Sequence, residues 1–176
     1  CYNCFRSSAS ADMCIMKPET CHYHLGTCRE PEWGEEHCFR PHIIYLANSS
    51  GVKVGITRQT QVPTRWIDQG AVQALPIIET PNRYLAGVAE VALKNHFADK
   101  TNWQKMLKNE VPVTNLFEEK SKLKQWLPEE TKPYFIEEDH LYQMDFPVQT
   151  YPLKVTSLNL EKTPNFSGKV VGIKGQ

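Results

Sequence analysis

The chain lacks a long hydrophobic run, a secretory signal peptide and any internal repeat. No segment approaches the roughly 18 consecutive apolar residues that a membrane-spanning helix needs. We therefore expect no membrane partner and a cytoplasmic location. The chain opens on a cysteine rather than a methionine and stops directly after a strand-like run, so we also expect a piece of a longer protein.

Net charge is absent too, because 20 lysines and arginines balance 20 aspartates and glutamates. The net charge of the chain therefore does not indicate what kind of partner it binds. Locally, residues 41–110 carry 8 basic and 5 acidic side chains, whereas residues 1–40 carry 4 and 6 and residues 111–176 carry 8 and 9. The mildly basic middle permits contact with a phosphate backbone without demanding it.

Cysteine is missing from residues 39–176, and all six cysteines lie before that point. A disulfide framework normally accompanies a secretory signal, whereas zinc can hold a short loop-rich segment that has no core of its own. The sequence therefore predicts a structural zinc module over residues 1–41. Its candidate ligands are Cys1, Cys4, Cys14, Cys21, Cys28 and Cys38.

The assignment of these ligands stays open. Cys1 and Cys4 form a C-x2-C pair, which supplies two ligands of a tetrahedral site. The other four cysteines follow at intervals of seven, seven and ten and could complete a four-thiolate site. His22, His24 or His42 could replace one of them, and buried free thiols or disulfides are the alternative to zinc.

The middle of the chain alternates strand and helix signals. A polar turn, NSSG at 48–51, separates two β-branched runs and predicts a hairpin. Pro63 suits a first helical turn, Asn82 suits a helix cap, and Pro76 places the third strand near a sheet edge. The predicted order is strands 42–46 and 52–57, helix 64–69, strand 71–80 and helix 83–97.

The last third follows a different pattern. Residues 118–126 predict a short charged helix, and residues 151–176 contain two strand-like runs, PLKVTSLNL and GKVVGIKG. We expect residues 111–176 to form a helix plus a β-rich extension. The whole chain then belongs to the α+β class.

Several polar residues stand where the fold does not need them. They are Tyr45, Lys53, Arg58, Arg65, Glu90 and Asn102. Taken singly, each has a plain structural explanation. A strand tyrosine is often half-buried core, a helical glutamate often pairs with a lysine or arginine one turn away, and Arg65 can pair with Asp68. Arg83, Gly87 and Lys94 share one helical face with Glu90.

Taken together, these residues resemble the pattern of GIY-YIG nucleases. IIY at 43–45 stands where that family has GIY, and KVGIT at 53–57 stands where it has YIG, with Val54 in the place of the second tyrosine. Arg65, Glu90 and Asn102 follow in the family's order. The whole chain also resembles a bacterial family known as domain of unknown function 2797, through MKPETCHYHLGTCREPEWG, KVGITRQTQVPTRWIDQGA and DKTNWQKMLK.

The resemblance implies a fold and a set of roles. Residues 42–110 would form a GIY-YIG-like small mixed sheet with helices. Glu90 would hold one magnesium or manganese ion, Tyr45 would act as or orient the general base, Arg65 would neutralise charge in the transition state, and Asn102 would brace the site. Lys53 or Arg58 would take part because related branches carry K-[IV]-G.

These expectations lead to a zinc-containing nucleic-acid-binding protein that is a metal-dependent endonuclease. Its DNA or RNA contacts would come from Lys53, Arg58, Arg65, Trp66 and Lys94, although Trp66 also suits a core position. A non-catalytic nucleic-acid or protein-binding module that retains the fold is the alternative. A purely structural zinc scaffold is the third possibility.

Overall fold

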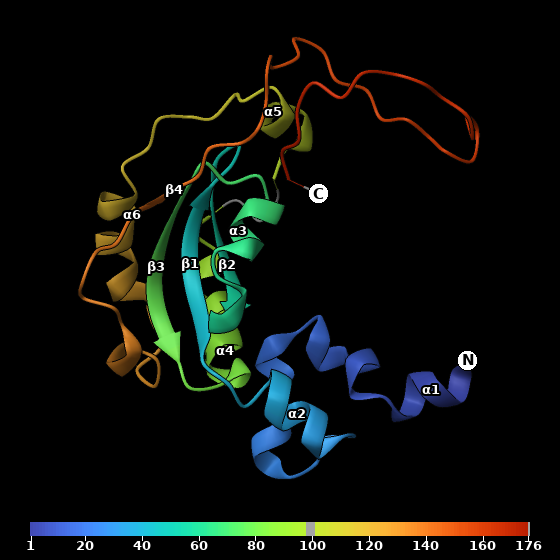
Figure 1. Cartoon of the computed structure of the whole chain (residues 1–176). Coiled ribbons are helices and arrows are strands. Elements are labelled where there is room, and N and C mark those ends of the chain that lie inside the picture. Colours follow the sequence, from blue (N-terminus) through green and yellow to red (C-terminus); the bar gives the residue numbers. More distant parts are fainter. Residues whose placement is uncertain (98–100, 176) are drawn as a thin grey trace.

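The computed structural model describes residues 1–97 and 101–175, and its centre is a four-stranded sheet with helices on both faces (Figure 1). The strands lie in the order β2-β1-β3-β4, and each neighbouring pair is antiparallel. No helix in this described part has the length and apolar character needed to cross a membrane. The strand bounds are β1 His42–Asn48, β2 Val52–Arg58, β3 Gln73–Thr80 and β4 Tyr142–Gln143.

Short helices dominate the rest of the described chain. The α-helices are α1 Tyr2–Ser7, α2 Pro31–His37, α3 Thr64–Asp68, α4 Arg83–Lys94, α5 Trp103–Leu107 and α6 Leu116–Leu123. The 3₁₀ turns are η1 Ala9–Ala11, η2 Met13–Ile15, η3 Pro18–Thr20, η4 Tyr23–Leu25, η5 Gln59–Gln61, η6 Lys124–Trp126 and η7 Lys132–Tyr134. The predicted hairpin and the helix after Pro63 are confirmed, and the helix from Arg83 ends three residues earlier than expected.

Strand β1 is buried along its whole length because helices cover both of its faces. Ile44 and Leu46 belong to the core that α4 and α6 build on one face. Tyr45 and Ala47 belong to a second core on the face that carries α3. Since side chains alternate along a strand, this one segment anchors two separate hydrophobic layers.

Pro76 lies on β3 beside a short neighbour, as its missing N–H requires. Strand β4 pairs only with Gln73 and Ala74, so it ends before it reaches Pro76. On the other side the register between β1 and β3 shifts at Ile44/Tyr45, where Tyr45 faces Pro76. Strand β3 thus lies next to the edge strand β4, and β4 does not extend as far as Pro76.

Two expectations about the sheets are wrong. The sheet is antiparallel rather than mixed, since each of its three neighbouring pairs of strands runs antiparallel. Residues 151–175 form no extended strand and contribute one isolated bridge, between Val148 and Gly172. Leu153 and Leu160 on this segment are exposed, and a strand-like pattern forms a ladder only where a partner edge is present.

The cysteine-rich segment, residues 1–41, is fixed to the start of α4. The Arg83 backbone N–H donates to the Cys38 carbonyl at 2.8 Å, and its guanidinium Nη2 donates to the Ile15 carbonyl at 2.8 Å. Turn η3 packs on Gly87, where an added Cβ would lie 2.2 Å from the backbone nitrogen of Glu19. Glycine is therefore required at this point because two backbones approach each other.

We expect Gly87→Ala to destabilise the protein by roughly 1–3 kcal/mol, because the new methyl group pushes η3 away from α4. Helix propensity alone would predict the opposite, a more stable protein, because alanine is favoured over glycine inside a helix by about 1 kcal/mol. Urea unfolding measures the change in the free energy of unfolding. Val91→Ala, on the exposed side of the same helix, is the matched control and should be neutral or slightly stabilising. A Gly87→Ala protein more stable than the wild type would contradict the packing argument.

Candidate functional site

A hollow of about 390 Å³ opens between β2, α3, α4 and the cysteine-rich segment. The charged side chains that line it are Arg58, Arg65, Arg83, Lys94 and Glu90, and this group is called the basic hollow below. Four cations and one carboxylate give the hollow a net positive lining, which would attract an anion.

Three elements bring these side chains together. Arg58 is the last residue of β2, and Arg65 lies in the first turn of α3, just after Pro63. The other three lie on α4 at positions 83, 90 and 94, whose spacing places them along one face. The hollow therefore forms at the edge of the sheet, where β2 has no further strand beside it.

Glu90 is 9% exposed, and its carboxylate Oε2 lies 3.5 Å from the ammonium of Lys94. A carboxylate held at the rim of a cationic hollow can keep one divalent cation next to a bound phosphate. Magnesium suits such a site, since it takes one or two carboxylates and fills its other positions with water and phosphate oxygens.

Tyr45 lies beneath this site rather than on its surface. Its side chain is wholly buried, and its hydroxyl donates to Oε1 of Gln69 at 3.3 Å. Burial raises the pKa of Tyr45 to about 12, against the opposing effect of the nearby Arg65 guanidinium. Gly55 faces Tyr45 across the hairpin, and a Cβ there would lie 2.8 Å from the tyrosine hydroxyl. The glycine after Val54 therefore makes room for the tyrosine ring.

Besides Tyr45, three further residues predicted for this site lie outside the basic hollow. Lys53, near the opposite end of β2, donates to Oγ1 of Thr101 at 2.7 Å. Asn102 caps α5 through its Oδ1, which accepts from the Lys105 backbone N–H, and its own N–H donates to Ser50. Trp66 is fully buried against the rings of Tyr45 and Tyr142, so its predicted contact with a base is wrong and its alternative core position is correct.

Arg83 and His42 are the two ionisable residues of the hollow that were not predicted as part of this site. Arg83 was noticed only as a possible partner of Glu90, although the spacing of 83, 90 and 94 was a usable signal. His42 was considered only as a zinc ligand. It is 1% exposed, its Nδ1 contacts the Arg40 carbonyl at 2.7 Å, and its Nε2 has no partner among the described residues.

Burial lowers the pKa of His42 to about 4, so the folded protein keeps this imidazole neutral. Above about pH 6.5 it is neutral in both states and adds no pH dependence. Between about pH 6.5 and pH 4 the unfolded chain binds a proton at His42 that the folded chain does not bind. The free energy of unfolding therefore decreases as the pH is lowered through this range, by about 3 kcal/mol in total. Urea unfolding at pH 7 and pH 4.5 measures this loss.

The control for this prediction is His42→Gln, which keeps a donor for the Arg40 carbonyl and cannot titrate. We expect the variant to lose less stability than the wild type between the two pH values. The subtraction removes every other titrating group that both proteins share. An identical loss in both proteins would contradict the assignment of a neutral buried imidazole.

A second candidate site lies in the cysteine-rich segment. Cys14, Cys21 and Cys38 are buried together, and Cys28 and His22 line the same small pocket. A hydrogen bond from the Cys38 thiol lowers the pKa of Cys21 to about 6, while burial raises the pKa of Cys14 to about 11. Soft thiols and an imidazole that line one pocket are the types of donor that zinc prefers.

His22, Asp12 and Cys14 place their ligand atoms within 4.8 Å of one another. The Asp12 carboxylate already accepts the Cys14 backbone N–H at 3.1 Å and pairs with the Arg29 guanidinium at 2.7 Å. These contacts hold the pKa of Asp12 below its usual value. Asp12 therefore has a structural role at this point, and the thiols and imidazole fit a metal better.

Cys1 and Cys4 face only each other, with their sulfurs 3.4 Å apart on the exposed helix α1. Within the described residues, Asp12, Cys14 and His22 are the only group of three or more ligand-type side chains whose ligand atoms all lie within 4.8 Å of one another, and Cys21, Cys28 and Cys38 are not part of it. The structure therefore separates this pair from the buried cluster that contains the other cysteines.

The comparisons with known proteins give one finding. No curated protein and no solved structure matches the chain. A family model described as "Protein of unknown function (DUF2797)" matches residues 1–176, which is the whole chain. The chain therefore belongs to the DUF2797 family of proteins of unknown function.

Proposed function

We propose that the protein binds nucleic acid in the basic hollow and hydrolyses phosphodiester bonds there with a divalent metal ion. The observation that carries the proposal is the convergence of Arg58, Arg65 and Lys94 with Glu90 around one hollow. Two of these, Arg65 and Glu90, are the residues that the GIY-YIG resemblance assigns to transition-state stabilisation and metal binding. A GIY-YIG-like site is thus the finer form of the proposal.

Each residue then has a role that its position permits. Glu90 binds magnesium or manganese, which supplies charge for the leaving oxygen. Arg65 donates to the phosphate oxygens where negative charge develops. Tyr45 orients Arg65 and Gln69 from below, since a wholly buried hydroxyl with a raised pKa is unsuited to take a proton from water.

We also propose that zinc occupies the cysteine cluster. Cys14, Cys21 and Cys38 would provide three ligands, with Cys28 or His22 as the fourth. Such a filled site has no open position for a substrate, so this zinc would be structural. Its role would be to hold η2 and η3 against α4, and thereby to build one wall of the basic hollow.

The test is an assay of the protein with magnesium or manganese on single-stranded, duplex, branched and RNA substrates. Cleavage in the presence of metal, with none when magnesium and manganese are left out, supports the endonuclease. Binding that weakens steeply with salt, without cleavage, supports the alternative of a non-catalytic binding module. If neither binding nor cleavage is detected, the nucleic-acid proposal is wrong.

A further inference from the structure

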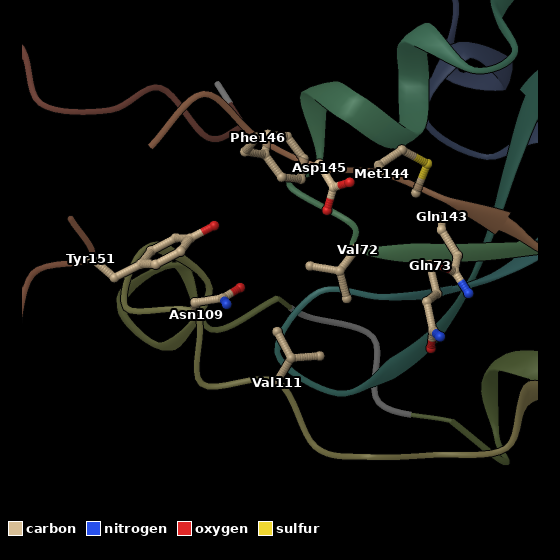
Figure 2. A pocket seen from close by; sticks show the side chains of 9 residues that line it. All are labelled: Val72, Gln73, Asn109, Val111, Gln143, Met144, Asp145, Phe146 and Tyr151. Atoms are coloured by element: carbon tan, nitrogen blue, oxygen red, sulfur yellow. The ribbon is translucent and has the colours of Figure 1, made fainter. Parts of the chain in front are cut away.

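A second hollow, of about 360 Å³, lies at the opposite end of the sheet from Arg58 and Glu90. It is bounded by the start of β3, by β4, by the turn after α5 and by the segment that follows β4 (Figure 2). Its volume lies within the range of small-ligand pockets, roughly 300–1,000 Å³. None of the roles proposed above involves this hollow.

The lining combines rings, amides and one carboxylate. Figure 2 shows Asp145 and Phe146 on one side, Tyr151 and Asn109 on another, and Val72 and Val111 on a third. The amide side chains of Gln73 and Gln143 stand at the end nearest the sheet. Flat rings, apolar contacts and mixed hydrogen-bonding groups form the type of surface that holds a nucleobase.

The Asn109 amide of this hollow has a fixed orientation. Lys174 is 6% exposed, donates to Oδ1 of Asn109 at 2.6 Å, and lies 5.2 Å and 5.4 Å from the ring centroids of Phe146 and Tyr151. With its oxygen turned to the lysine, the amide of Asn109 has its NH₂ group left to donate. The hollow thus offers a donor at Asn109 and an acceptor at Asp145.

This combination discriminates among bases. Guanine has two adjacent donors, N1–H and the N2 amine, beside the acceptor O6. A carboxylate can accept from both donors while an amide NH₂ donates to O6. Adenine and cytosine place a lone pair next to their amine, and thymine or uracil has one donor between two oxygens. In adenine, in cytosine and in thymine or uracil, an acceptor of the base would therefore face the carboxylate, which is itself an acceptor.

We propose that this hollow binds a single unpaired guanine, with Asp145 as the group that selects it. The proposal deepens the function above, because it rests on the protein acting on nucleic acid. The base would lie at one end of the sheet while the phosphate backbone crosses toward the basic hollow at the other. The protein would then prefer single-stranded or unpaired segments that carry guanine.

The experiment measures fluorescence anisotropy of the full chain, without magnesium, on a short labelled thymidine oligonucleotide with one central guanosine, adenosine or cytidine. We expect the guanosine oligonucleotide to bind about tenfold more tightly than the others. Asp145→Asn should bring this ratio close to one. Glu161→Gln, which removes the same charge from another exposed position, should leave the ratio unchanged.

No guanine preference in the wild type, or a preference that persists in Asp145→Asn, would overturn the proposal. If no oligonucleotide binds at all, the nucleic-acid function fails, and guanosine alone then tests the hollow. Methyl signals of Val72 and Val111 that shift with guanosine in the wild type and not in Asp145→Asn would support the hollow independently. No shift in the wild type would overturn it.

Discussion

Replacing Glu90 by glutamine should abolish metal-dependent cleavage of nucleic acid while leaving its binding as tight as before or tighter. The substitution keeps the shape of the side chain and removes the charge that would hold the metal ion. Loss of several kcal/mol of transition-state stabilisation corresponds to a rate reduction of about 10³-fold or more. Binding persists because Arg58, Arg65 and Lys94 remain and one repulsive charge has gone. Single-turnover cleavage and anisotropy measure the two effects separately.

The matched control is Glu130→Gln, an exposed carboxylate outside the hollow, which should change neither quantity. Arg65→Ala should lower cleavage by about 10²–10³-fold and weaken binding as well, because its guanidinium would contact both the bound phosphate and the transition state. Cleavage by Glu90→Gln at the wild-type rate would remove the metal from the mechanism. Unchanged binding without any wild-type cleavage would instead favour the non-catalytic binding module.

Removing the metal from the cysteine cluster should unfold residues 1–41 and leave the sheet folded. Structural zinc contributes on the order of 10 kcal/mol to the folding of small metal-bound segments at pH 7, and this segment has few other buried groups. The prediction is one zinc per chain by elemental analysis. After chelation or in Cys38→Ser, limited proteolysis should cut rapidly within residues 1–41.

The matched control is the double variant Cys1→Ser, Cys4→Ser, because these exposed thiols lie apart from the buried cluster. It should keep one zinc and resist the protease like the wild type. Loss of the zinc in this variant would show that Cys1 and Cys4, and not the buried cluster alone, hold the metal. A wild-type protein that contains no zinc and resists proteolysis would contradict the metal itself.

The hairpin and the two helices that follow it could be predicted from the sequence, because short-range features determine where these elements begin and end. Three such features are the turn between β1 and β2, Pro63 before α3 and the Asn82 cap of α4. Each affects only the few residues next to it, so it can be recognised in the sequence. The α+β class follows from their order. The cluster of three buried cysteines also agrees with the crowding seen in the sequence.

The errors concern long-range placement. Trp66 has suitable chemistry, but whether a side chain faces a hollow or a core depends on residues far along the chain, such as Tyr142. The alternating residues 151–160 resemble a strand, yet no partner edge meets them. The hollow beside Asp145 joins three parts of the chain that are distant in sequence, residues 72–73, 109–111 and 143–151, and no local pattern predicts such a site.

Arg83 belongs to both halves of the molecule, because it lines the basic hollow and also donates to the carbonyl groups of Cys14 and Ile15. A metal that orders those carbonyls fixes the guanidinium, and a phosphate bound to the guanidinium favours the ordered carbonyls. The two ligands then share a coupling free energy, which acts equally in both directions. Nucleic acid should therefore raise the affinity for zinc by the same factor by which zinc raises the affinity for nucleic acid.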